Sequence, residues 1–376
     1  MIYRALTGTQ TLRRCLACGH TRDDRPAYRF ITGRDAPVAV VATSLYQLLT
    51  PDRAAEEQDV PGGGRKLLSF ADSRQDAAFF AHYLESTYQR LLRRSLIYST
   101  IANGGASGEL RVADVAERLL AAADEHDLFT FSQSRDERRR HCLAWLMQEM
   151  VALDSRISLE GVGLLRLRLV RPKRWVPPLA LRNPPWSLTA DQAWELLVLL
   201  LDTLRQQGAV TFPDLVDVTS EAFKPRNVAM YVRDVSEPKS HIFGWLPKSP
   251  LASNRRLDFL VRLLGRRAGL SESAANEHAC NALALLWGLL TEQRGEMHGY
   301  LVGKRLSYLG TAYQLNHQLY EWVPVADTAT VYQCNRCGSL AYVSLDGVCP
   351  TYRCDGTLVA VRRDETQEAN HYRHLY

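Results

Sequence analysis

Four cysteines in the last fifth of the chain have the residue type and spacing of a metal site. Two residues separate Cys334 from Cys337, four separate Cys349 from Cys354, and eleven lie between the pairs. Zn²⁺ prefers four soft ligands in a tetrahedron, and four thiolates leave no open position for a substrate. Gly338 directly follows the first pair and permits the positive φ that such a turn needs. The pattern predicts a structural zinc site, with a disulfide or chance clustering as the alternatives.

The other cysteines carry weaker signals. Cys15 and Cys18 form a second Cys-x-x-Cys pair, which predicts either a half-site completed by ligands elsewhere or a pair without function. Cys142 and Cys280 stand alone in apolar helical stretches, which favours buried small residues. Residues 1–20 lack a signal-peptide pattern, so we expect a cytoplasmic, reducing setting in which paired cysteines are metal ligands before they are disulfides.

A short stretch, 165–169, alternates strictly between leucine and arginine, which predicts a strand with one apolar and one basic face. Arg166, Arg168 and Arg171 could neutralise phosphates there while Trp175 stacks on a base. This pattern predicts contact with nucleic acid, DNA in the first place. The alternative is an ordinary solvated surface, since arginine usually lies outside.

The chain lacks the usual motifs for ATP hydrolysis. No glycine-rich G-x-x-x-x-G-K-[ST] loop occurs. The acidic string 124–127 resembles a Walker B motif, but it follows an alanine-rich, helical stretch rather than a buried strand. We therefore expect a chance string at a helix end, no catalytic residue, and no ATP hydrolysis by this chain alone.

Composition and periodicity predict a helix-rich, mixed α/β protein. The 376 residues are enough for two or three domains, and 46% hydrophobic with 23% charged residues excludes a mostly disordered chain. The net charge of +5 permits a nucleic-acid partner without requiring one. No apolar run approaches ~18 residues, so no membrane span is expected. Apolar spacing predicts helices at 74–101, 112–123, 135–153, 190–207, 254–264 and 273–290.

Residues 66–71 predict a short buried strand followed by a capped helix, which together make one β–α unit of an α/β domain. The whole string 66–80 resembles the opening of the second RecA-like domain of large bacterial superfamily 2 DEAD/DEAH-box helicases. The resemblance equates the capped turn with helicase motif IV. The residues of that turn are Asp72, Ser73, Arg74 and Gln75.

The resemblance touches four further stretches: 33–37, 253–258, 347–358 and 371–376. It implies an ATP-dependent DNA helicase, in which ATP and Mg²⁺ lie between two RecA-like domains of the complete protein. The Walker motifs and motifs V and VI of that family are not found in this sequence. The resemblance therefore implies an internal fragment, or a truncated or split gene product, whose missing RecA-like portions neighbouring reading frames would encode.

We therefore expect five parts along the chain. They are an amino-terminal segment with the Cys15/Cys18 pair (1–60), a RecA-like strand–helix unit (61–104), a mainly helical insert (105–325), a small four-cysteine zinc ribbon (326–362), and a tail leading to the rest of the RecA-like domain (363–376). The insert and the ribbon would contact nucleic acid or a partner domain. The alternative is a stand-alone zinc-ribbon protein that binds nucleic acid or acts as an adaptor.

Overall fold

The computed structural model describes most of the chain from residue 74 onward. The described residues are 45–46, 48–50, 52, 64–66, 74–104, 110–126, 128–130, 132–152, 157–224, 226–235, 241–249, 252–307 and 310–365. They divide into two compact units, and the division falls after Ser95. The second unit, from Leu96 onward, contains the sheets and the candidate site described below.

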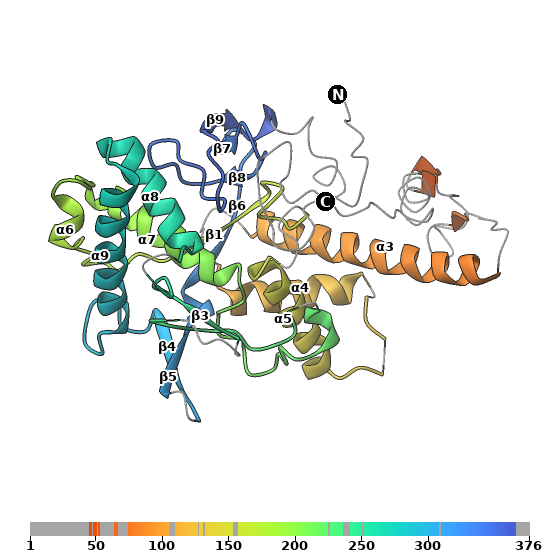
Figure 1. Ribbon diagram of the computed structural model, residues 1–376. Coiled ribbons are helices and arrows are strands. Elements are labelled where there is room, and N and C mark those ends of the chain that lie inside the picture. Colours follow the sequence, from red (N-terminus) through yellow and green to blue (C-terminus); the bar gives the residue numbers. More distant parts are fainter. Residues whose placement is uncertain are drawn as a thin grey trace, which may run out of the picture. The chain divides into compact units, whose positions relative to one another are not determined.

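The described residues form a mixed α/β structure with seven α-helices (Figure 1). The helices are α3 (Arg74–Ala102), α4 (Val112–Glu125), α5 (Arg135–Met150), α6 (Leu179–Arg182), α7 (Ala190–Arg205), α8 (Arg255–Ala268) and α9 (Glu272–Thr291). The six long helices lie where apolar spacing predicts them, to within a few residues at each end. None of the helices in the described part of the chain is long and apolar enough to cross a membrane.

Three small sheets complete the second unit. The first pairs β1 (Leu165–Leu169) with β6 (Tyr320–Pro324). The second has the order β3-β2-β5-β4 and comprises β2 (Tyr231–Arg233), β3 (Ile242–Gly244), β4 (Leu301–Leu306) and β5 (Gly310–Leu315). The third has the order β8-β7-β9 and comprises β7 (Thr330–Cys334), β8 (Leu340–Ala341) and β9 (Leu358–Arg362). Short 3-10 turns lie at Glu221–Phe223 and His317–Leu319.

The strand expected at 165–169 is confirmed as β1. Its three leucines are buried, while Arg166 and Arg168 lie on the opposite face. β1 pairs antiparallel with β6, so Arg168 lies directly across from Glu321 and Leu167 across from Trp322. The two-residue period of the sequence therefore puts both arginines on one side of this sheet.

Side-chain caps set the start of the helices that matter most here. Thr189 begins α7 with a capping box to Gln192, and Asn254 begins α8 by accepting hydrogen bonds from the amides of Arg256 and Leu257. Gly269 ends α8 with φ 63°, a left-handed conformation that suits glycine. α8 and α9 then run side by side (Figure 1).

A buried arginine anchors α7 within this unit. The Arg205 side chain is fully buried and forms ion pairs with Glu160 at 2.7 Å and Asp202 at 2.8 Å. It also donates to the carbonyl oxygen of Met150 at 2.7 Å. Because the charge is paired and its donors are used, burial is tolerated, and α7 is fixed to the end of α5 and to the loop before β1.

The expected mainly helical insert contains more strands than the sequence indicates, and several other predicted features lie outside the described residues. The stretch 105–325 is rich in helix but also carries all six strands β1 to β6, of which the alternating pattern indicates only β1. Most of the strand expected at 66–71, the turn residues Asp72 and Ser73, the pair Cys15/Cys18 and most of the 363–376 tail lie outside the described residues. Arg74 and Gln75 lie in the first turn of α3, where only the backbone is described.

Candidate metal centre

The first cysteine turn lies at the end of β7. Cys334 is the last residue of that strand, and Cys337 follows within the turn that leads to β8. The amide of Gly338 donates to the carbonyl oxygen of Cys334 at 3.0 Å and closes the turn. Gly338 has φ 72°, a conformation that costs a residue with a Cβ free energy. The glycine of the Cys-x-x-Cys-Gly pattern therefore has the positive φ that the sequence predicts for this turn.

The second cysteine turn lies between β8 and β9. Cys349 and Cys354 flank it, and the amide of Cys354 donates to the carbonyl oxygen of Thr351 at 3.1 Å. Gly347 precedes the turn with φ 70°, and its carbonyl oxygen accepts a hydrogen bond from Leu358 at 2.8 Å. β9 pairs with β7, so this pairing brings the second turn beside the first.

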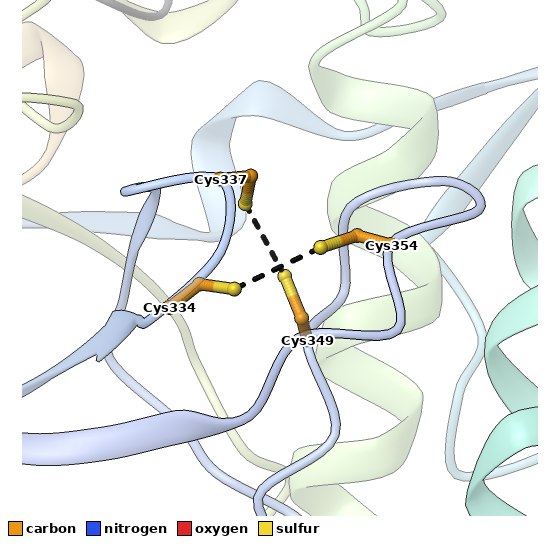
Figure 2. Close-up of side chains that lie close together, drawn as sticks. All are labelled: Cys334, Cys337, Cys349 and Cys354. Atoms are coloured by element: carbon orange, nitrogen blue, oxygen red, sulfur yellow. Dashed lines mark hydrogen bonds between the residues drawn. The ribbon is translucent and has the colours of Figure 1, made fainter. Parts of the chain in front are cut away.

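The four sulfur atoms face a common centre, as Figure 2 shows. The Sγ atoms of Cys334 and Cys354 are 3.7 Å apart, those of Cys337 and Cys349 are also 3.7 Å apart, and all four lie within 4.8 Å of one another. A tetrahedron with metal–sulfur bonds of about 2.3 Å has sulfur–sulfur edges of roughly 3.8 Å. A disulfide bond would need about 2.05 Å, and all four are free thiols. The cluster is therefore able to hold a metal ion.

The cluster is closed to solvent on most sides. Cys334, Cys349 and Cys354 are at most 2% exposed, and Cys337 is half-buried. Ala341, Leu358 and Tyr332 pack against the cysteines. The other buried apolar residues of the described stretch 326–362 are few and mostly small, namely Val331, Val343, Leu345 and Val348. So small an apolar core supplies little folding free energy, which a bound metal would supplement.

The electrostatics of the cluster favour a thiolate at Cys337. Hydrogen bonding with the Cys349 thiol, and with the hydroxyl groups of Ser339 at 3.0 Å and Thr351 at 3.6 Å, lowers the pKa of Cys337 to about 3. Burial raises the pKa of Cys354 to about 11. The same hydrogen bond raises the pKa of Cys349, so this pair of cysteines favours one thiolate, which is the form that binds a metal.

Two oppositely charged residues of helix α8, Arg262 and Asp258, hold the second cysteine turn. Arg262 donates hydrogen bonds to the carbonyl oxygens of Cys349 at 2.8 Å, Cys354 at 2.6 Å and Thr351 at 3.2 Å. Asp258, one helical turn earlier, pairs with Arg262 at 2.8 Å and accepts a hydrogen bond from the amide of Arg353 at 3.0 Å. The backbone of the turn is thus held by a complementary acid and base.

Further contacts extend this attachment. Arg267 pairs with Asp346 at 2.6 Å, and Arg266 donates to the Thr357 hydroxyl at 3.1 Å. On the other side, the Tyr342 hydroxyl lies within hydrogen-bond distance of the carbonyl oxygens of Glu160 and Leu165, at 2.8 and 2.7 Å. The metal module, defined here as residues 326–362, is therefore attached both to α8 and to the loop before β1.

The three predicted basic residues, Arg166, Arg168 and Arg171, line one groove, whereas Trp175 does not. Arg166 lies over the Tyr342 ring at 5.9 Å, Arg168 pairs with Glu321 at 2.6 Å, and Arg171 pairs with Asp191 at 2.5 Å. Trp175 is 8% exposed and packs edge-on against Trp194. Its indole nitrogen donates to the carbonyl oxygen of Ala190. This burial argues against the base-stacking role predicted for Trp175.

The lone cysteines lie away from this chemistry. Cys142 is fully buried on α5, where burial raises its pKa to about 12, as a structural cysteine requires. Cys280 is half-buried on α9. Neither belongs to a group of metal-binding side chains within the part of the chain that the structure describes.

Comparison with known proteins identifies no relative. No family model matches the chain, and neither a curated protein nor a solved structure does.

Proposed function

We propose that Cys334, Cys337, Cys349 and Cys354 bind one structural Zn²⁺. The sulfur–sulfur distances of 3.7 Å fit a tetrahedral tetrathiolate site, and four cysteine ligands leave no position for a substrate. Soft thiolates select zinc over the hard cations Ca²⁺ and Mg²⁺. The ion would contribute folding free energy on the order of 10 kcal/mol to the metal module and hold the two cysteine turns together.

Metal analysis of the purified chain tests this proposal. We expect about one zinc per chain from this cluster. Cys349→Ser should lower the zinc content and make the metal module sensitive to protease, whereas the matched change Cys280→Ser on α9 should alter neither. A zinc-free protein whose metal module resists protease would contradict the proposal.

We propose further that the chain supplies an accessory part of an ATP-dependent superfamily 2 DNA helicase. One observation supports this beyond the sequence resemblance itself. The resembling stretches 253–258 and 347–358 meet, because Asp258 accepts a hydrogen bond from the amide of Arg353. Two separated stretches that resemble one family and also form one interface are better explained by a shared structural role than by chance.

In this role the chain has no ATPase site of its own. ATP and Mg²⁺ would bind between RecA-like domains in the complete assembly, while α8 and the metal module hold nucleic acid or a partner domain. The other candidate, a stand-alone zinc-ribbon adaptor, is favoured by the tight attachment of the module to its own helical body.

Neighbouring reading frames and co-purification separate the two candidates. We expect adjacent frames to encode Walker A and B motifs and motifs V and VI. Their products should co-purify with this chain and show DNA-stimulated ATPase activity in its presence. Adjacent frames without such motifs, together with a chain that purifies alone, would favour the adaptor.

A further inference from the structure

A groove of about 920 Å³ lies between β1, α7 and the two cysteine turns. Arg166 and Arg168 of β1 form one wall, Val198 and Leu199 of α7 another, and the cysteine turns a third. Cavities of this size commonly bind ligands. The groove is bounded by the metal module, and Cys337 of the proposed zinc site lies in its lining, but zinc binding by the four cysteines leaves the arginines and tyrosines of the groove unused.

Among the charges of the groove, Arg168 and Arg255 are exposed, whereas the carboxylates are half-buried or buried and Arg205 is fully buried. Five arginines and four carboxylates line it. Of the carboxylates, the side chains of Glu321, Glu160 and Asp202 are only 6, 14 and 21% exposed. The side chain of Arg168, paired with Glu321, is 48% exposed. Anionic ligands would therefore meet guanidinium groups first.

The fourth carboxylate lies close enough to Arg166 for the two charges to interact. Glu195 lies on α7, half-buried, and burial raises its pKa. Arg255, at the start of α8, adds a further guanidinium to the lining. Positive charge thus approaches the groove from two separate elements.

Aromatic and apolar groups lie between these charges. Tyr342 and Tyr352 line the groove, and each ring has a guanidinium near its face, that of Arg166 at 5.9 Å and that of Arg353 at 5.0 Å. The Tyr342 hydroxyl is fixed by two backbone carbonyls, so its ring is held in place. Bases stack on tyrosine rings and on guanidinium planes.

We propose that this groove binds a short single-stranded nucleic-acid segment. Arg166, Arg168 and Arg255 contact its phosphates, and bases lie against Tyr342 and Tyr352. A single strand fits better than a duplex, because only unpaired bases can reach apolar walls and tyrosine rings while their phosphates contact the rim. The proposal deepens the proposed helicase role, on which it rests for its choice of ligand.

Binding of the zinc-loaded chain to fluorescent oligonucleotides tests the groove. We expect single-stranded DNA or RNA to bind with an affinity that falls with salt, and Arg166→Ala to reduce the salt slope by roughly 0.7. Tyr352→Ala should weaken binding roughly 5- to 150-fold, the range for loss of a stacked base. Arg174→Ala is the matched control, because Arg174 is exposed in the same basic stretch but does not line the groove.

The outcomes separate the groove from the helicase role. Single-strand binding that Arg174→Ala weakens as much as Arg166→Ala and Tyr352→Ala would overturn the groove, as would binding to duplex alone or none at low salt. Binding of an acidic peptide in place of oligonucleotides would also overturn it. A zinc-loaded chain that co-purifies with RecA-like partners and fails these binding tests leaves the helicase role standing. Groove-dependent binding by a chain without such partners supports the groove and removes the helicase role.

Discussion

Arg262 is the residue that joins helix α8 most directly to the second cysteine turn. Its guanidinium group donates to three backbone carbonyl oxygens, two of which belong to cysteines of the metal cluster. Asp258 neutralises its charge and accepts a hydrogen bond from the same turn. Because these partners are carbonyls and an amide, substitution of the turn's side chains would leave the contact largely intact.

Removal of the Arg262 side chain should loosen the metal module. We expect Arg262→Ala to lower the free energy of unfolding by roughly 1.5–3 kcal/mol, since buried carbonyls lose charged donors. Zinc release to a chelator should accelerate in the same variant. Arg266→Ala, on the same helix with one exposed hydrogen bond, should cost about 0.5 kcal/mol or less. Equal effects of the two variants would contradict this role.

His317 gives the fold a pH dependence. It is 6% exposed, and its Nδ1 lies 2.7 Å from the Thr211 hydroxyl oxygen. Burial lowers its pKa to about 4, although the charge of Asp214 opposes this shift. The unfolded chain therefore binds the proton more readily, so the stabilising contribution of neutral His317 is lost as pH falls from about 6.5 towards 4.

Between pH 7 and pH 5, His317 should lower the free energy of unfolding by about 2 kcal/mol. We expect denaturant unfolding to show that loss in the native chain and a smaller one in His317→Gln. His298→Gln, which changes an exposed histidine, should retain the native pH dependence. Both measurements need zinc in excess, because acid also protonates cysteine ligands. An unchanged pH dependence in His317→Gln would assign the loss to other groups.

At the scale of elements, α8 contacts two different surroundings along its length. Near its start, Arg256 points into the helical body, where it is 2% exposed, lies over the Trp245 ring at 5.1 Å and donates to the Thr203 hydroxyl at 2.7 Å. Burial lowers the pKa of Arg256 to about 9. Further along, Asp258 and Arg262 contact the cysteine turn. One helix thus links the buried body to the metal module.

The first cysteine turn tests how backbone conformation supports the cluster. Gly338 has φ 72° and no heavy atom within 4 Å of the place a Cβ would take, so an added methyl group meets only conformational strain. We expect Gly338→Ala to cost about 1–2 kcal/mol and to weaken zinc binding. Gly288→Ala, also without a close neighbour but inside α9, should stabilise by about 0.5–1 kcal/mol. Equal signs for the two would contradict the conformational argument.

Local periodicity explains which elements the sequence could predict. The six long helices and β1 have clear apolar spacing, and the four cysteines of the cluster stand close in sequence. β2 and β3 have three residues each, too few for a period to show, and β6 pairs with a strand about 150 residues away. The contact of Asp258 and Arg262 with the cysteine turn could not be predicted either, because their partners there are backbone groups, which no residue type in the sequence indicates.

At the scale of the whole molecule, the acidic string 124–127 bears on whether the chain could hydrolyse ATP. Asp124 and Glu125 lie in the last turn of α4, and Asp124 pairs with Arg138 at 2.7 Å. This helical setting agrees with the expectation from the alanine-rich stretch before it. A Walker B carboxylate that binds Mg²⁺ belongs instead at the end of a buried strand.

We therefore expect the isolated chain to release no phosphate from ATP above a mock purification, with or without DNA. A phosphate-release assay on the native chain and on Glu125→Gln measures this. Turnover that the native chain shows and Glu125→Gln loses would mean that the acidic string is catalytic after all.

The pairing of β1 with β6 has a consequence for synthesis of the chain. About 150 residues separate the two strands, so closing this loop costs ~2 kcal/mol more than closing a ten-residue hairpin. A ribosome adding about 5–20 residues per second leaves β1 without its partner for on the order of ten seconds. During that time the unpaired backbone of β1, with its three exposed leucines, could pair with a strand of another nascent chain. Arg166 and Arg168, placed between them, are the kind of charge that keeps an apolar strand from such aggregation.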